Sequence, residues 1–173
     1  HYARRRTTAE KYAARILSFG RGDGADVRVL DEFALADGTQ ITAQLPDCEL
    51  AFTLSQPGAH WVSNSMAVLA VVHALGGDMA AAGLALADLE GIAGRGARFK
   101  AQVEGGTALI IDESYNANPA SMAATLAVLK EAHGKRRIAV LGAMRELGAE
   151  SDALHSGLAP HILDAGVDYA LLV

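Results

Sequence analysis

The sequence predicts an α/β protein made of two modules, an antiparallel β meander with helices followed by a parallel α/β unit. Three observations predict this fold class. Short apolar, β-prone segments separated by turn residues occupy residues 26–54. After Pro57-Gly58 the apolar residues take the spacing of helices. From residue 107 onward apolar strands alternate with helical segments, which is typical of a parallel sheet with helical crossovers.

Composition and charge limit the class of protein. Of the 173 residues 51% are hydrophobic, so one domain or two small ones can bury a core. The net charge of -5 does not favour nucleic-acid binding. No apolar run is long enough to insert into a membrane. A single cysteine, Cys48, and the lack of a visible signal peptide fit the cytoplasm.

The first module is predicted to begin with a charged helix over residues 1–15 and a short strand over 16–20. The β meander then follows, with Asp37-Gly38 as a two-residue hairpin turn. Its strands are expected at 27–30, 41–45 and 50–54.

Two helices are predicted to complete the first module. The helix over 61–75 is apolar on most sides, which predicts that it is buried, and Gly76-Gly77 ends it. The helix over 79–89 has Asp78 as a candidate N-cap.

The second module is predicted to contain strands that alternate with helices. Its strands are expected at 107–111, 137–141 and 169–173, and its helices at 120–130 and 151–165. A further strand expected at 99–103 precedes it and is joined to the strand over 107–111 by Glu104-Gly105-Gly106. We place the division between the modules at residues 104 and 105. The chain begins at His1 and ends inside an apparent core strand, so we expect a fragment of a longer protein.

The turn between the strand over 107–111 and the helix over 120–130 carries the strongest functional signal. It reads Asp-Glu-Ser-Tyr-Asn-Ala-Asn-Pro over residues 112–119 and holds two of the three asparagines. Such strand-to-helix turns are where α/β sheets present groups to ligands. Taken alone, an Asn-Ala-Asn-Pro segment is more often a structural turn, with Pro119 suited to the first helical position.

A second polar group lies at the start of the helix over 61–75. His60 and Asn64 are four residues apart, so they share a helix face near the N-terminus, where polar ligand edges and anions are favoured. An amide side chain suits the edge of an adenine. The alternative is that His60 caps the helix and Asn64 is an ordinary polar residue.

Two glycine-containing loops are further candidates. Arg95 and Arg98, in the Gly94–Arg98 loop, could clamp phosphates or lie in solvent. Residues 141–148 follow a second strand, and we expect this loop and the Asp112 turn to leave the same sheet. Ser151 after it is a candidate N-cap, and His155 shares its face without a third catalytic partner.

These motifs, in this order, resemble the Mur ligases, ATP-dependent amide ligases of peptidoglycan synthesis. The resemblance rests on Gly58-x-His60 with Asn64, on Gly94-Arg95, on residues 112–122 and on the 141–148 segment with Ser151 and His155. It implies that residues 1–104 form the later part of the central ATPase domain. Residues 105–173 would then be the first half of a Rossmann-like C-terminal domain.

The resemblance also implies an activity. The Tyr-Asn-Ala-Asn-Pro turn is similar to the branch that joins D-alanyl-D-alanine to UDP-N-acetylmuramoyl tripeptide, using ATP and Mg²⁺, through an acyl phosphate. A monomer is expected. The P-loop lysine and the metal ligands would lie upstream, so the resemblance assigns no catalytic residue and no metal ligand here. The fragment alone is expected to be inactive.

The resemblance assigns two groups of site residues. The ATP-binding residues are His60, Asn64, Arg95, Asp112 and Glu113. The acceptor-binding residues are Tyr115, Asn116 and Asn118. The chain departs from the family pattern at Trp61, at Glu113 and at Ala143, where relatives often have Asn, Asp and Asp. The alternatives are a sister ligase of the folylpolyglutamate synthase type, or a non-catalytic α/β ligand-binding module.

Overall fold

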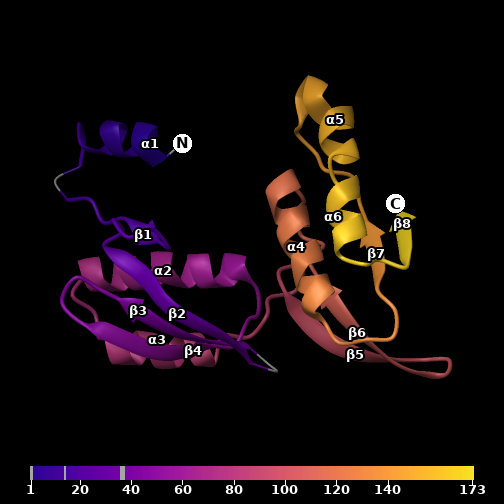
Figure 1. Cartoon of the computed structure of the whole chain (residues 1–173), viewed down its shortest axis with the longest axis horizontal. Helices are drawn as coiled ribbons and strands as arrows, with labels where there is room; N and C mark the ends of the chain where they lie inside the picture. The colour runs from indigo at the N-terminus through magenta and orange to yellow at the C-terminus, as the bar shows by residue number, and fades with distance from the viewer. Residues whose placement is uncertain (1, 14, 36–37) are drawn as a thin grey trace. The chain divides into compact units, whose positions relative to one another are not determined.

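The computed structural model describes residues 2–13, 15–35 and 38–173, which fold into two compact units (Figure 1). The first unit comprises His1–Ser55 and Trp61–Asp88, and the second comprises Gln56–His60 and Leu89–Val173. The mixed α/β class predicted from the sequence is confirmed. The predicted domain boundary between residues 104 and 105 stays a prediction.

The first unit is built on a four-stranded sheet of order β1-β2-β3-β4. Its elements are α1 (Tyr2–Ala9), β1 (Phe19–Gly20), β2 (Val27–Leu35), β3 (Gly38–Gln44), β4 (Glu49–Leu54), α2 (Ala59–Ala74) and α3 (Met79–Ala87). Strands β2, β3 and β4 pair antiparallel, so the predicted meander is confirmed. The first helix is shorter than predicted, and of the expected strand over 16–20 only the last two residues pair, with β2. Predictions for residues 1, 14 and 37 lie outside the described residues.

The core of the first unit follows the two periods of the sequence. Ile41 and Ala43 alternate into the interior from β3, and Leu45, directly after the strand, is also buried. Val62, Ser65, Met66, Leu69 and Ala70 form the buried face of α2. The predicted burial of this helix is confirmed for that face alone, because Val68 and Val71 on its other face are exposed. Asp78 caps α3 as predicted, with Oδ1 accepting from the Ala80 N–H at 2.8 Å.

The second unit contains two separate two-stranded sheets. Its elements are β5 (Ala97–Val103), β6 (Gly106–Asp112), α4 (Pro119–Glu131), β7 (Ile138–Leu141), η1 (Gly148–Glu150), α5 (Ser151–Ser156), α6 (Ala159–Asp164) and β8 (Tyr169–Leu172). Strands β7 and β8 pair in parallel as predicted. The expectation that β6 and β7 share a sheet is wrong. The short turn after Val103 gives β6 a local antiparallel partner over its full length.

The predicted helix over 151–165 is divided into α5 and α6. Pro160 lies in the first turn of α6, where its missing N–H costs nothing, and its ring disfavours a continuous helix through this point. Ser151 is not an N-cap. It is the first residue of α5, which the chain enters from the helical turn η1 without a side-chain cap.

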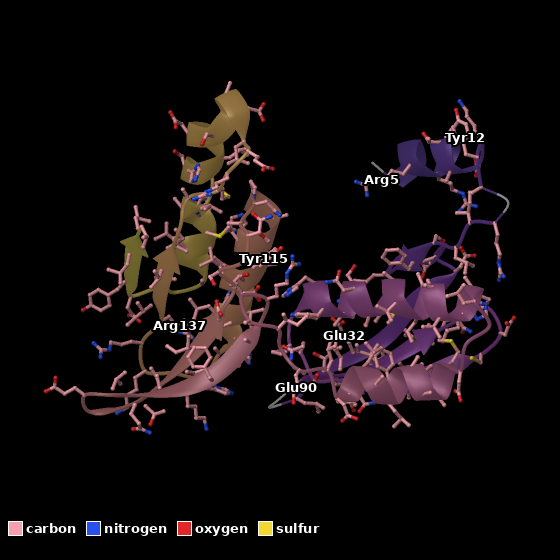
Figure 2. The ribbon with its side chains drawn as sticks, turned by 180° about the vertical axis from the view of Figure 1, so that it is seen from behind. Arg5, Tyr12, Glu32, Glu90, Tyr115 and Arg137 are labelled. Atoms are coloured by element: carbon pink, nitrogen blue, oxygen red, sulfur yellow. The ribbon has the colours of Figure 1, made fainter. Side chains whose placement is uncertain are left out.

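The core of the second unit joins α4, β7 and α6, which lie side by side in Figure 1. Leu126, Ala139 and Ala165 are its buried centre. Arg137, labelled in Figure 2, fixes the end of α4, because its Nε donates to the Leu129 carbonyl oxygen at 3.1 Å. This packing sets the position of α4, which starts directly after the candidate turn.

A short segment before α2 also belongs to the second unit. The Gln56 amide donates from Nε2 to the Leu89 carbonyl oxygen at 3.0 Å. Gly58 lies against α4, since a Cβ there would be 2.8 Å from Val128 Cγ2. Within the described ranges, no helix is both long and apolar enough to cross a membrane.

Candidate functional site

Asp112, at the end of β6, joins the turn that follows it to the loop at Gly94. Its Oδ1 accepts from the Ser114 hydroxyl at 2.7 Å and from the Ser114 N–H at 3.1 Å. Its Oδ2 accepts from the Gly94 N–H at 2.9 Å. These hydrogen bonds, the Ser114 hydroxyl first among them, lower the pKa of Asp112. The group is therefore a carboxylate at neutral pH with both oxygens in use.

The backbone reinforces this joint between residues 94–96 and 112–115. The Gly96 N–H donates to the Asp112 carbonyl oxygen at 2.9 Å, and the Tyr115 N–H donates to the Gly94 carbonyl oxygen at 3.1 Å. Gly94 has a φ of 74°, and a Cβ there would be 2.9 Å from the Cβ of Tyr115. Only glycine fits this position without a shift of the neighbouring backbone.

Arg95 and Tyr115 project from this joint as a stacked pair. The Arg95 Cζ lies 4.0 Å from the centroid of the Tyr115 ring, within the range of a cation–π interaction. Tyr115, labelled in Figure 2, belongs to the turn that joins β6 to α4. The guanidinium is exposed, so its N–H donors can reach an anion such as a phosphate.

Glu113 lies in a different environment from the neighbouring Asp112. Burial raises the pKa of Glu113, and the negative charge of Asp112 adds to the shift, while Arg98 opposes it. Two adjacent carboxyl groups with pKa values moved in opposite directions are typical of functional sites, although structural networks also produce them.

Asn116 and Asn118 use their amide oxygens within the turn. The Asn118 Oδ1 accepts from the Ser121 N–H at 2.9 Å, and the Ser121 Oγ accepts from the Asn118 N–H at 3.0 Å. This capping box starts α4, with Pro119 in its first turn as predicted. The Asn116 Oδ1 accepts from the Ala117 N–H at 2.9 Å. Oriented this way, the two NH₂ groups remain as donors for a ligand.

His60 and Asn64 lie together on α2, whereas the other six predicted site residues lie in residues 95–118. The helix begins at Ala59, so His60 is already inside its first turn and does not occupy the N-cap position. Burial lowers the pKa of His60, which favours the neutral ring. Asn64 is exposed one turn further along.

The loop after β7 is held by His155. The Met144 N–H donates to His155 Nε2 at 2.9 Å, and His155 Nδ1 lies 2.8 Å from the Ser151 carbonyl oxygen. Because Nε2 accepts, the proton is on Nδ1 and is donated to Ser151. The Ser151 hydroxyl oxygen also lies 3.3 Å from Nδ1, so both ring nitrogens have partners within the protein.

Sequence reasoning missed three contributors to the site. Gly94 supplies an N–H and a backbone conformation, and Ser114 and Ser121 fix the turn. Two local signals could have found the serines. Asp-x-Ser is typical of an Asx turn, and Asn-x-x-Ser has the spacing of a capping box. Among the residues that the structure describes, no group of three His, Cys, Asp or Glu could hold a metal ion.

Comparison with known protein families gives one match within the second unit. The profile of the family "Mur ligase, glutamate ligase domain" matches residues 94–173. The match therefore begins at the glycine that accepts from Tyr115 and donates to Asp112.

Similar curated proteins carry the names of ligases that act on UDP-N-acetylmuramate or its tripeptide. The UDP-N-acetylmuramoyl-tripeptide–D-alanyl-D-alanine ligase of Escherichia coli (strain K12) is 38% identical over 79% of this chain and 29% of its own length. That of Rickettsia prowazekii (strain Madrid E) is 31% identical over 91% of this chain and 34% of its own length. A UDP-N-acetylmuramate–L-alanine ligase of Streptomyces coelicolor is 34% identical over 73% of this chain and 27% of its own length. The chain thus spans about a third of these relatives.

Similar solved structures carry related names. A structure of MurF from Acinetobacter baumannii has a TM-score of 0.78 and 28% identity, and covers 98% of this chain and 35% of that chain. The MurF ligase from Thermotoga maritima in complex with ADP has a TM-score of 0.71 and 25% identity, and covers 96% of this chain and 42% of that one.

Proposed function

Because the chain belongs to the Mur ligase family, we propose that it is part of the ATP-dependent ligase that joins D-alanyl-D-alanine to UDP-N-acetylmuramoyl tripeptide. The observation that carries this proposal is the Tyr-Asn-Ala-Asn-Pro turn held directly against Gly94-Arg95. The names of the relatives support the same substrate pair. Such a carbon–nitrogen ligase would act as a monomer in the cytoplasm, in the peptidoglycan synthesis on which cell shape and division depend.

The chemistry requires an activated carboxylate. The terminal carboxylate of the tripeptide takes the γ-phosphoryl group of ATP and releases ADP. The amine of D-alanyl-D-alanine then attacks the acyl phosphate, which forms the amide, releases phosphate and gives up a proton. A carboxylate oxygen is a poor leaving group until it is phosphorylated, and the growing negative charge needs cationic partners. Among the proposed site residues of this chain, Arg95 would supply such a cation.

The residues of the chain divide between the two substrates. The exposed Arg95 guanidinium would bind phosphate oxygens, and Asn64 would bind the adenine edge near the neutral His60. Asp112 and Glu113 would support the nucleotide side. The NH₂ groups of Asn116 and Asn118 would donate to the acceptor, with Tyr115 beside them. We assign Mg²⁺, which would screen phosphate charge, and the P-loop lysine to the part of the protein outside this chain.

Phosphate release by the full-length protein tests the proposed function. We expect release only when ATP, the UDP-muramoyl tripeptide and D-alanyl-D-alanine are all present. L-alanine or glutamate in place of the dipeptide should give no release. Equal turnover with L-alanine or glutamate would favour a sister ligase, and no release with any acceptor would favour a non-catalytic binding module.

The adenine role of Asn64 has a separate test. In the full-length protein, Asn64→Ala should weaken ATP binding by about 1–3 kcal/mol, because a polar edge of the base loses its partner. Ser63→Ala, at the exposed neighbouring position of α2, is the control. Calorimetric titration with ATP measures both, and equal affinities for the two variants would contradict the adenine contact.

A further inference from the structure

The Tyr115 ring is stacked on the Arg95 guanidinium, and this contact indicates the role of Tyr115. We infer that Tyr115 is a positioning residue whose ring holds the Arg95 guanidinium ready for the phosphates, and that it does not act as a contact for the acceptor. The inference rests on the proposed function in one respect, namely that Arg95 meets a phosphate. It replaces the acceptor role that the family resemblance gave to Tyr115.

The first step concerns the guanidinium. Arginine is a long side chain with many rotamers, and Arg95 is exposed. Within residues 2–13, 15–35 and 38–173, the Tyr115 ring, 4.0 Å away, is the one partner that the structure gives the Arg95 side chain. Stacking uses the flat face of the guanidinium. Its five N–H donors point outward in the plane and stay available for an anion.

The second step concerns the ring. Its position follows from the backbone, because the Tyr115 N–H donates to the Gly94 carbonyl oxygen at 3.1 Å. On the other side of Gly94, the N–H donates to the Asp112 carboxylate at 2.9 Å. Arg95 is the next residue along the chain. The backbones of Arg95 and Tyr115 therefore belong to the same hydrogen-bonded joint, which fixes the position of the ring relative to the Arg95 backbone.

The third step concerns the exposure of the ring. Tyr115 is 67% exposed, so packing in a core does not explain an aromatic residue here. One face of the ring is covered by Arg95. An acceptor contact would use the hydroxyl group, whereas a platform for Arg95 uses the ring face. The two roles can therefore be separated by substitution.

The experiment compares Tyr115→Phe with Tyr115→Leu in the full-length protein. We expect Tyr115→Leu to raise the dissociation constant of a non-hydrolysable ATP analogue about two- to fivefold, the range of an exposed cation–π interaction. Tyr115→Phe keeps the ring and should restore most of that affinity. Tyr169→Leu, which removes another exposed tyrosine of the second unit, is the control and should bind like the wild type.

A double-mutant cycle tests whether Tyr115 acts through Arg95. In an Arg95→Ala background, Tyr115→Leu should have no further effect on analogue binding. An undiminished effect there, or no effect of Arg95→Ala itself, would overturn the inference. So would a Tyr115→Phe variant as weak as Tyr115→Leu together with a raised KM for D-alanyl-D-alanine. Analogue binding needs no acceptor, so a wrong acceptor assignment would leave this test valid.

Discussion

The turn after β6 and the loop after β7 are held by two different kinds of side chain. Asp112 accepts three hydrogen bonds as an ionised carboxylate, and the turn that it fixes carries exposed polar groups. His155 accepts one N–H, that of Met144, a residue that is only 3% exposed. The same unit therefore contains one connection that leaves polar side chains exposed and another that holds a buried methionine.

The largest effect on stability and ATP binding is expected from a side chain added at Gly94, where the Asp112 turn leaves no space for one. Gly94→Ala should lower the free energy of unfolding by about 1–3 kcal/mol and weaken ATP binding, because a Cβ would meet Tyr115 and φ is positive. Gly105→Ala is the matched control, with φ at 83° and no atom within 4 Å of its added Cβ. Urea unfolding and nucleotide titration measure both. Equal losses for the two variants would mean that the joint tolerates a side chain.

The next effect separates stability from binding in the loop after β7. His155→Ala leaves the Met144 N–H without its acceptor and should cost about 1–3 kcal/mol in the free energy of unfolding. ATP affinity should not change, because neither His155 nor the residues that it contacts are among the proposed ATP-binding residues. His161→Ala, at an exposed position of α6, is the control. A His155→Ala variant that unfolds like the control would contradict the bracing role.

The smallest effect concerns the charge of Asp112. Asp112→Asn keeps the shape but replaces one acceptor oxygen with an NH₂ group, so Tm should fall at neutral pH. A carboxyl group whose pKa is lowered on folding stabilises above its unfolded pKa, ordinarily near 3.8, and this contribution is lost as pH falls through the folded pKa. The difference in Tm between wild type and variant should therefore shrink below about pH 4. A difference that stays constant with pH would exclude the charge as its cause.

Features with a local cause could be predicted from the sequence, and those with a distant cause could not. The meander and the Asp78 cap follow from periodicity and short-range hydrogen bonding. The helix start at Asn118 was also within reach, because its partner Ser121 is three residues away. The pairing of Tyr115 with Arg95 depends on a hairpin that brings separated residues together, and no sequence period encodes it.

Two further differences arise from competition between local preferences. Strand β6 pairs with β5 across the predicted short turn at residues 104–106, which makes that pairing cheap in loop entropy. The separation of β7 and β8 into a sheet of their own was not foreseen. The helix over 151–165 has the right periodicity throughout, yet Pro160 divides it. The position of the candidate turn was foreseen from residues 112–119. The way its amide oxygens are used was not.

The bond between Gln56 and Leu89 has a practical consequence for protein engineering. It joins the two residues that flank the segment containing α2 and α3. Between these two residues the chain leaves the second unit and returns to it. A chimera that exchanges residues 57–88 between similar chains would preserve this hydrogen bond if the junctions were placed at Gln56 and Leu89. Swaps made there would transfer Asn64 without disturbing Arg95 or its aromatic platform.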